Sequence, residues 1–371
     1  MQYTRMPIEI ESPEEMGYGN IKFNLAESSV RDISLGSLDV DLKNLVLFYG
    51  EHKGITKLRE AIKENSKVLQ ADDVLVTSGA ATALFVVATT LLNPADHLVV
   101  IRPNYGTNLE TPRAINCAIS IIDLKFEHNF EIDIEAVRKA VQPNTKLISI
   151  TNPHNPTGKV FSDATIKQLI ALAEEKGCRL LVDETYRDLN FQTQFKPYWA
   201  EASNKVISVS SVSKSFGAPG IRIGWIINRD QKLMHDFLAA KEQICLCNSV
   251  VDEEIAFHLL HNKKTILATH HAHIQTNFAY FKQWFATQKY LEWAEPQAGV
   301  VCFPRLKAEY TMDKEKFYDT LFSQYGTIVG PGHWFEQDKI YMRIGFGYPL
   351  FDELKTGLDN LNKCFEALVQ K

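Results

Sequence analysis

The segment Ser211–Gly224 places a lysine among small and hydroxyl side chains, and an arginine follows eight residues later. The amine of Lys214 can form a Schiff base with a carbonyl cofactor. Ser211, Ser213 and Arg222 suit a phosphate dianion, because arginine offers a planar fork of donors. Pyridoxal phosphate combines an aldehyde, a phosphate and a ring that accepts electrons from a carbanion. The alternative is a surface loop with a solvated lysine.

Two upstream apolar runs also end in polar residues. The turn Asn152–Gly158 follows the run 147–150, and Asp183 follows the run 180–182. Ligand sites of α/β proteins lie at this carboxyl edge of the sheet. A carboxylate there can pair with a pyridine nitrogen and keep it protonated, which makes the ring a stronger electron sink. The alternatives are an ordinary turn after a strand and an aspartate that caps a helix.

Two further segments suit anions. Gly79, Ala80 and Ala81 follow the strand expected at 74–77 and begin a helix. Backbone N–H groups at a helix N-terminus bind phosphate, and small residues allow close approach. Arg343 is the one charged residue in the apolar segment 340–346. Arginine is almost never buried unpaired, so it faces either solvent or an anion.

The order Asn155, Asp183, Lys214, Arg222, each near a strand end, resembles the fold-type I pyridoxal-phosphate aminotransferases of class I/II. The resemblance covers nearly the whole chain. It implies that Lys214 carries the cofactor and that Asp183 pairs with the pyridine nitrogen. Asn155 and Tyr186 would bind the phenolic oxygen, with Asn155 also beside the substrate.

The resemblance extends to three residues elsewhere. Tyr105, after the strand expected at 98–101, would stack on the pyridine ring; otherwise it is a surface tyrosine. Arg343 would bind the substrate α-carboxylate. Tyr49 would reach the phosphate of a neighbouring subunit, which implies a homodimer.

The segment Asn24–Val30 departs from the common pattern, in which a glycine or an Asn-Glu-Asn run occurs. It looks similar to the capreomycidine synthase-like subgroup. Ala26 and Glu27 are therefore candidate substrate-binding residues. If Glu27 faces the pocket, it favours a cationic or hydrogen-bond-donating side chain; otherwise it caps a turn.

Three functions fit these residues. The first is an aminotransferase that moves an amino group from an L-amino acid to a 2-oxo acid. The second is an elimination or cyclisation enzyme, similar to capreomycidine synthase or a C–S lyase, because residues that bind the cofactor do not decide the reaction. The third is an amine-sensing regulator, which would need an N-terminal winged helix and a basic surface.

Composition is that of a globular enzyme. The chain has 371 residues, 45% of them hydrophobic, and a net charge of −5 with no Lys/Arg-rich run, so neither nucleic acid nor an anionic membrane is an expected partner. The N-terminus lacks the apolar run of a signal peptide, and six irregularly spaced cysteines suggest reduced thiols, so a cytoplasmic location is expected. His270, His271 and His273 are expected on a solvated helix face, and no metal is predicted.

The elements that position these residues alternate along the chain. Strands are expected near 74–77, 98–101, 118–124, 146–151, 179–183, 205–209 and 222–227, with a helical pattern between them, as over 165–176. This predicts an α/β fold with a mostly parallel seven-stranded sheet between helices. Long helices follow to about residue 288, with strands near 299–306 and 340–346. A large domain is expected over 46–250, and a smaller α+β domain from 1–45 and 251–371.

Overall fold

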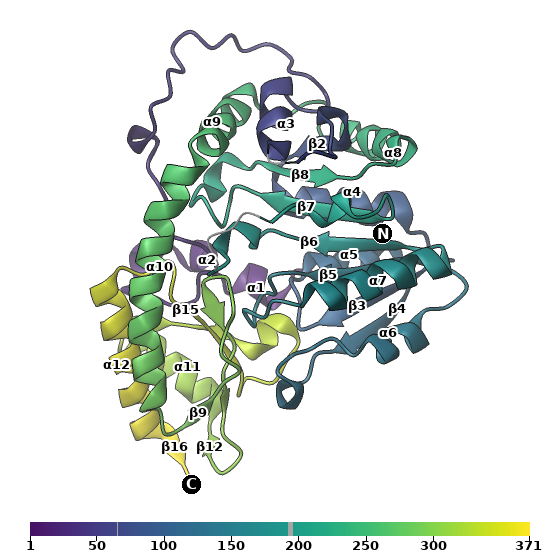
Figure 1. Cartoon of the computed structure of the whole chain (residues 1–371). Coiled ribbons are helices and arrows are strands. Elements are labelled where there is room, and N and C mark those ends of the chain that lie inside the picture. The colour runs from purple at the N-terminus through teal and green to yellow at the C-terminus, as the bar shows by residue number, and fades with distance from the viewer. Residues whose placement is uncertain (65, 192–195) are drawn as a thin grey trace.

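A seven-stranded sheet forms the centre of the computed structural model, which describes residues 1–64, 66–191 and 196–371. Its order is β2-β8-β7-β6-β5-β3-β4 (Figure 1). The strands are β2 (Val74–Thr77), β3 (His97–Arg102), β4 (Ala118–Asp123), β5 (Thr145–Thr151), β6 (Arg179–Asp183), β7 (Val206–Ser211) and β8 (Gly224–Ile227). All neighbours pair in parallel except β8, which is antiparallel to β2 and β7. The predicted mostly parallel sheet is therefore confirmed.

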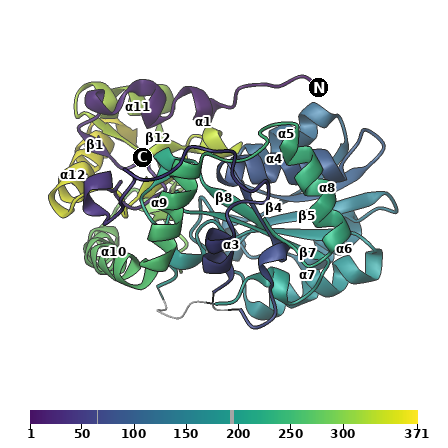
Figure 2. The same ribbon diagram turned by 90° about the horizontal axis from the view of Figure 1, so that it is seen from above.

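Helices cover both faces of this sheet, because successive residues of each buried strand point to opposite sides. Leu98 and Val100 pack in a cluster with α4 (Gly79–Leu91), α5 (Thr107–Ile115) and α8 (Gln231–Glu242). Val99 and Ile101 pack in a second cluster with α6 (Ile134–Ala140) and α7 (Asp163–Lys176). A third cluster joins β2 and β8 to α3 (Thr56–Lys63) and α9 (Val250–His261). Figure 2 shows α3 and α9 at one end of the sheet.

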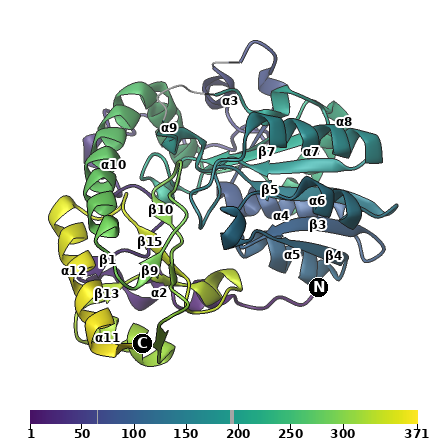
Figure 3. The same cartoon turned by 60° about the horizontal axis from the view of Figure 1, so that its bottom comes forward.

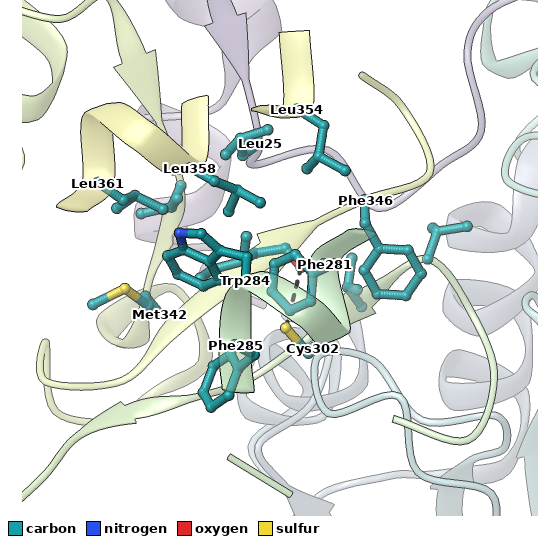
Figure 4. Close-up of a cluster of buried hydrophobic side chains, with 14 of the residues drawn as sticks. Leu25, Phe281, Trp284, Phe285, Cys302, Met342, Phe346, Leu354, Leu358 and Leu361 are labelled. Carbon is teal, nitrogen blue, oxygen red and sulfur yellow. Dashed lines mark hydrogen bonds between the residues drawn. The ribbon is translucent and has the colours of Figure 1, made fainter. Parts of the chain in front are cut away.

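The smaller part is built from both ends of the chain. Strand β1 (Phe23–Asn24) pairs in parallel with β13 (Thr327–Ile328), and Leu25 packs among residues of the last third. The aromatic core around Phe281 and Phe346 lies between α10 (Lys263–Ala286) and α12 (Phe351–Leu368), as Figure 4 shows. The other elements are α1 (Pro7–Ile10), α2 (Pro13–Met16), α11 (Lys314–Ser323), β9 (Leu291–Glu292), β10 (Val301–Cys302), β11 (Arg305–Leu306), β12 (Thr311–Met312), β14 (Gly330–Pro331), β15 (Met342–Gly345) and β16 (Val369–Gln370). The predicted domain limits stay a prediction.

Two predicted strands differ from the structure. The strand expected at 299–306 is split into β10 and β11, which flank Pro304. Proline lacks the N–H that a strand ladder needs, and here only its carbonyl bonds, to the N–H of Met342 (3.0 Å). The strand expected at 222–227 begins two residues later, because Arg222 has a φ of +48° in the left-handed region.

None of the helices in the described ranges has the length and apolar character required to cross a membrane.

Candidate active site

A cavity of about 680 Å³ opens at the carboxyl end of the parallel strands, against the smaller part of the molecule. Figure 3 shows the sheet on one side and β10 and β15 on the other. Twelve of the residues predicted from the sequence line this cavity: Glu27, Ala80, Ala81, Tyr105, Asn155, Asp183, Tyr186, Ser211, Ser213, Lys214, Arg222 and Arg343. Three predicted residues, Ala26, Gly79 and Tyr49, are not part of its wall.

Lys214 presents a free amine to the cavity. It lies just beyond β7, and its backbone carbonyl accepts a bond from the N–H of Val30 (3.1 Å). Its side chain is half-buried and makes no hydrogen bond or ion pair within residues 1–64, 66–191 and 196–371. An amine held in a cavity without a partner is available for covalent chemistry with a carbonyl group.

The turn before α4 and the Arg222 side chain form a cradle for a small anion. Gly79 has a φ of +83°, and a Cβ there would lie 2.6 Å from Nη2 of Arg222. A Cβ on Gly224 would lie 2.5 Å from the backbone N of Ala80. Arg222 is held in place by a bond from Nη1 to the carbonyl of Pro219 (2.8 Å). Glycine is therefore needed for the guanidinium to approach the N-terminus of α4, where backbone N–H groups suit a phosphate.

Asp183 is a buried carboxylate at the end of β6, with 4% of its surface exposed. Its Oδ1 accepts bonds from the N–H (3.0 Å) and the hydroxyl (2.6 Å) of Thr185. Burial raises the pKa of Asp183, and the two bonds from Thr185 oppose that rise. A cation beside it, such as a protonated pyridine nitrogen, would favour the ionised carboxylate.

Arg343 is buried in β15, only 4% exposed, so the alternative of a solvated arginine is wrong. Its Nη1 donates to Oδ1 of Asn155 (3.2 Å) and its Nη2 to the carbonyl of Ala26 (2.6 Å), while Nε has no partner among the described residues. Burial lowers the pKa of Arg343. No carboxylate within the described residues forms an ion pair with it, which leaves it able to bind an anion.

Tyrosines of the predicted site occupy three environments. Tyr105 follows β3, and burial raises its pKa, with a further rise from the Glu9 carboxylate. The Tyr186 hydroxyl donates to Oγ of Ser28 (3.1 Å). Tyr49 is 81% exposed and lies outside the cavity of its own chain. The single chain therefore brings every predicted cofactor contact to this cavity except Gly79, which lies behind the wall against Arg222, and Tyr49, which is expected from a partner.

Comparison with known proteins agrees with this geometry. The model of the family described as aminotransferase class I and II matches residues 16–349. The chain belongs to this family. It is similar to capreomycidine synthase of Streptomyces vinaceus, with 26% identity over 92% of this chain and 89% of that protein. It is also similar to an aspartate aminotransferase of Sulfurisphaera tokodaii, with 23% identity over 92% and 87% of the two chains.

Solved structures show the same fold. A pyridoxal-phosphate-dependent aminotransferase from Streptococcus suis superposes with a TM-score of 0.90 at 26% identity, over 100% of both chains. The pyridoxal-phosphate-dependent cyclase OrfR superposes with a TM-score of 0.88 at 23% identity, over 99% of this chain and 98% of that one. The family, fold and cofactor predictions are confirmed. The protein is a pyridoxal-phosphate-dependent enzyme of fold type I, and the relatives include both aminotransferases and cyclases.

Sequence reasoning missed two features of this family member. Asn104 accepts bonds from Asn108 (3.1 Å) and Thr151 (3.1 Å) beside Tyr105, and so fixes the loop after β3. The N-terminal segment with α1 and α2 forms one wall of the cavity, where Arg5, Glu9 and Glu14 are found. The sequence signal for this wall was the run of acidic residues in the N-terminal segment.

The histidine prediction needs a correction. His270, His271 and His273 are half-buried on α10, not solvated. The ring of His271 bonds through Nε2 to the carbonyl of Asp188 (2.7 Å), and burial lowers the pKa of His270 to about 4. Within the described ranges no group of histidine, cysteine and acidic residues is arranged to hold a metal ion.

Proposed function

We propose that the protein is an aminotransferase that moves an amino group from an L-amino acid to a 2-oxo acid. The observation that carries the proposal is one cavity that holds the amine of Lys214, the buried carboxylate of Asp183 and the guanidinium of Arg343, which forms no ion pair with a carboxylate of the described residues. When bound, pyridoxal phosphate supplies an electron sink for the carbanion left by the α-proton.

Each of these residues has a defined task. Arg343 would bind the α-carboxylate with its planar fork, and its bonds to Asn155 and Ala26 fix its orientation. Lys214, once its amine is free, would take the α-proton and return it to a neighbouring carbon. Asp183 would hold a proton on the pyridine nitrogen through its charge. The cradle at Gly79 and Arg222 would anchor the phosphate.

A second reaction has support from the relatives. Capreomycidine synthase is similar to this chain in sequence, and the cyclase OrfR shares its fold. A reaction in which a leaving group departs from Cβ, and which ends as an elimination or a ring closure, needs the same cofactor contacts. A screen of L-amino acids with 2-oxo acids separates the two reactions. An aminotransferase yields a new amino acid from the acceptor, whereas elimination or cyclisation consumes the donor without any acceptor.

We expect Arg343→Ala to lower kcat/KM for every amino donor. The loss should correspond to about 2–5 kcal/mol of transition-state stabilisation, the range for truncating one member of a buried charge pair. Arg343→Lys should recover only part of this loss, because lysine lacks the second parallel donor. Steady-state kinetics check this, with the surface replacement Arg138→Lys on α6 as control. If Arg343→Lys keeps kcat/KM for all donors, the carboxylate role is wrong.

We also propose a homodimer in which Tyr49 completes the phosphate site of the partner. Tyr49 ends an exposed apolar run with Val46, Leu47 and Phe48, whose exposed fractions are 67%, 77% and 60%. Such a run costs free energy in water unless another surface covers it. Sedimentation should give a dimer at micromolar concentration.

A mixing experiment tests the shared site of this dimer. Tyr49→Ala chains and Lys214→Ala chains should each be impaired alone. A mixed dimer should regain one complete site, which pairs the intact lysine of one chain with the intact tyrosine of the other. A fully active monomer, or no recovery on mixing chains that do exchange, contradicts the proposal.

A further inference from the structure

The N-terminal segment brings three carboxylates to the cavity. Helix α1 lies between the large sheet and the smaller part (Figure 1), and both α1 and α2 contribute to the cavity wall. Glu9 comes from α1 and Glu14 from α2, while Glu27 comes from the extended segment after β1. These three residues are called the acidic wall below.

The charges that line the cavity do not balance without a ligand. Arg5 is already paired with Glu15, with 3.1 Å between Nη2 and Oε2. Under the proposed function the cofactor and the α-carboxylate engage the other charged groups, which are Asp183, Lys214, Arg222 and Arg343. The acidic wall is left over, since none of its three carboxylates forms an ion pair with any described residue.

Glu14 links the other two carboxylates electrostatically, because it acts on Glu9 and, together with Glu27, on Tyr18. Burial raises the pKa of Glu9, and the charge of Glu14 adds to the rise, while the charge of Arg5 opposes it. The Tyr18 hydroxyl donates to Oε1 of Glu27 (3.1 Å), and its pKa is raised by burial and by the charges of Glu27 and Glu14. Glu9 and Glu27 are half-buried, and Glu14 is exposed at the mouth of the cavity. Like charges gathered at one wall disfavour one another unless a cation joins them.

An independent feature of the same cavity indicates a ligand. Arg343 is 4% exposed, and its Nε is buried without a partner among the described residues. Glu27 and Glu14 both act on its pKa, so they lie within electrostatic reach of its guanidinium. A molecule that fills this space therefore meets a cation at Arg343 and anions at the acidic wall. An amino acid with a cationic side chain matches this arrangement, because its α-carboxylate would meet Arg343 and its side chain would meet the acidic wall.

Building on the proposed function, we propose that Glu9, Glu14 and Glu27 select an amino donor whose side chain ends in a cation, an ammonium or a guanidinium. Glu9 and Glu14 are the specificity-determining residues that α1 and α2 supply. Glu27 lies nearest to Tyr18, whose hydroxyl keeps one of its oxygens oriented.

The test compares L-arginine with L-citrulline, which has nearly the same shape and no charge. The first readout is kcat/KM for each donor with the holoenzyme. The second is calorimetric binding to holoenzyme reduced with borohydride, in which amino transfer is blocked. We expect arginine to be preferred by about tenfold in both readouts, because an ion pair in a partly buried site gives more stabilisation than one that is fully exposed.

Variants test which carboxylates cause the preference for arginine. The double replacement Glu9→Gln and Glu14→Gln should bring the arginine-to-citrulline ratio close to one, while each single replacement lowers it in part. Glu366→Gln, on the exposed side of α12, is the control and should leave the ratio unchanged. Thermal melting checks that each variant is folded. The arginine-to-citrulline ratio of the wild type tests the proposal even if a variant does not fold.

Two results would overturn the inference: equal use and equal binding of both amino acids by the wild type, or an unchanged ratio in the folded double variant. Failure of the proposed function looks different. In that case no donor passes its amino group to a 2-oxo acid acceptor, yet reduced holoenzyme still binds arginine more tightly than citrulline if the acidic wall selects cations.

Discussion

Replacing Lys214 with alanine is expected to abolish turnover and to remove the covalently attached cofactor. Lys214 is the amine that faces the cavity, and it has no partner among the described residues that would compete for it. Without it the chain would lack both the proposed attachment point and the proposed base for the α-proton. Turnover assays and the cofactor's absorbance before and after borohydride reduction measure the two losses.

Two controls make the Lys214 prediction specific. Lys214→Arg keeps a positive charge but cannot attach the cofactor, so it should be as inactive as the alanine variant. Lys232→Ala, at an exposed lysine of α8, should behave as wild type. Peptide mapping after borohydride reduction should find the cofactor on Lys214. A label on another lysine would refute the assignment.

Asp183→Ala is expected to lower kcat by roughly 10²-fold or more, which corresponds to about 3 kcal/mol of transition-state stabilisation. Under the proposed function the buried carboxylate would keep a proton on the pyridine nitrogen, and that charge would stabilise the carbanion. Asp183→Asn is the sharper variant, because it keeps the shape and the acceptor for Thr185 but removes the charge.

The kinetics of both Asp183 variants must be measured with cofactor bound. The phosphate cradle at Gly79 and Arg222 does not involve Asp183, so saturating cofactor should still occupy the site. Single-turnover rates at saturation then report the chemical step. Near wild-type rates in Asp183→Asn would contradict the role of its charge.

The large sheet could be predicted from the sequence because its strands are apolar runs that end in polar residues. The run 180–182 leads to Asp183, and β6 ends at that residue. Since parallel strands share one carboxyl edge, the polar residues after β5, β6 and β7 had to meet at one edge. The structure places Asn155, Asp183 and Lys214 around one cavity.

Features that depend on distant contacts could not be predicted in this way. The burial of His270 and His271 follows from packing of α10, which local composition does not reveal. The acidic wall depends on where α1 and α2 pack, and neither four-residue helix has a periodic pattern of its own. The broken strand at Pro304 was the exception, because that proline was visible in the sequence.

The measurement that tests the central claim most directly is a half-reaction with no acceptor present. Holoenzyme mixed with an excess of amino donor should convert its cofactor to the amine form once per site and release one equivalent of the 2-oxo acid. Addition of a 2-oxo acid should then restore the original absorbance. Continuous consumption of the donor without an acceptor, with release of ammonia or a cyclised product and no amine form of the cofactor, would contradict amino transfer.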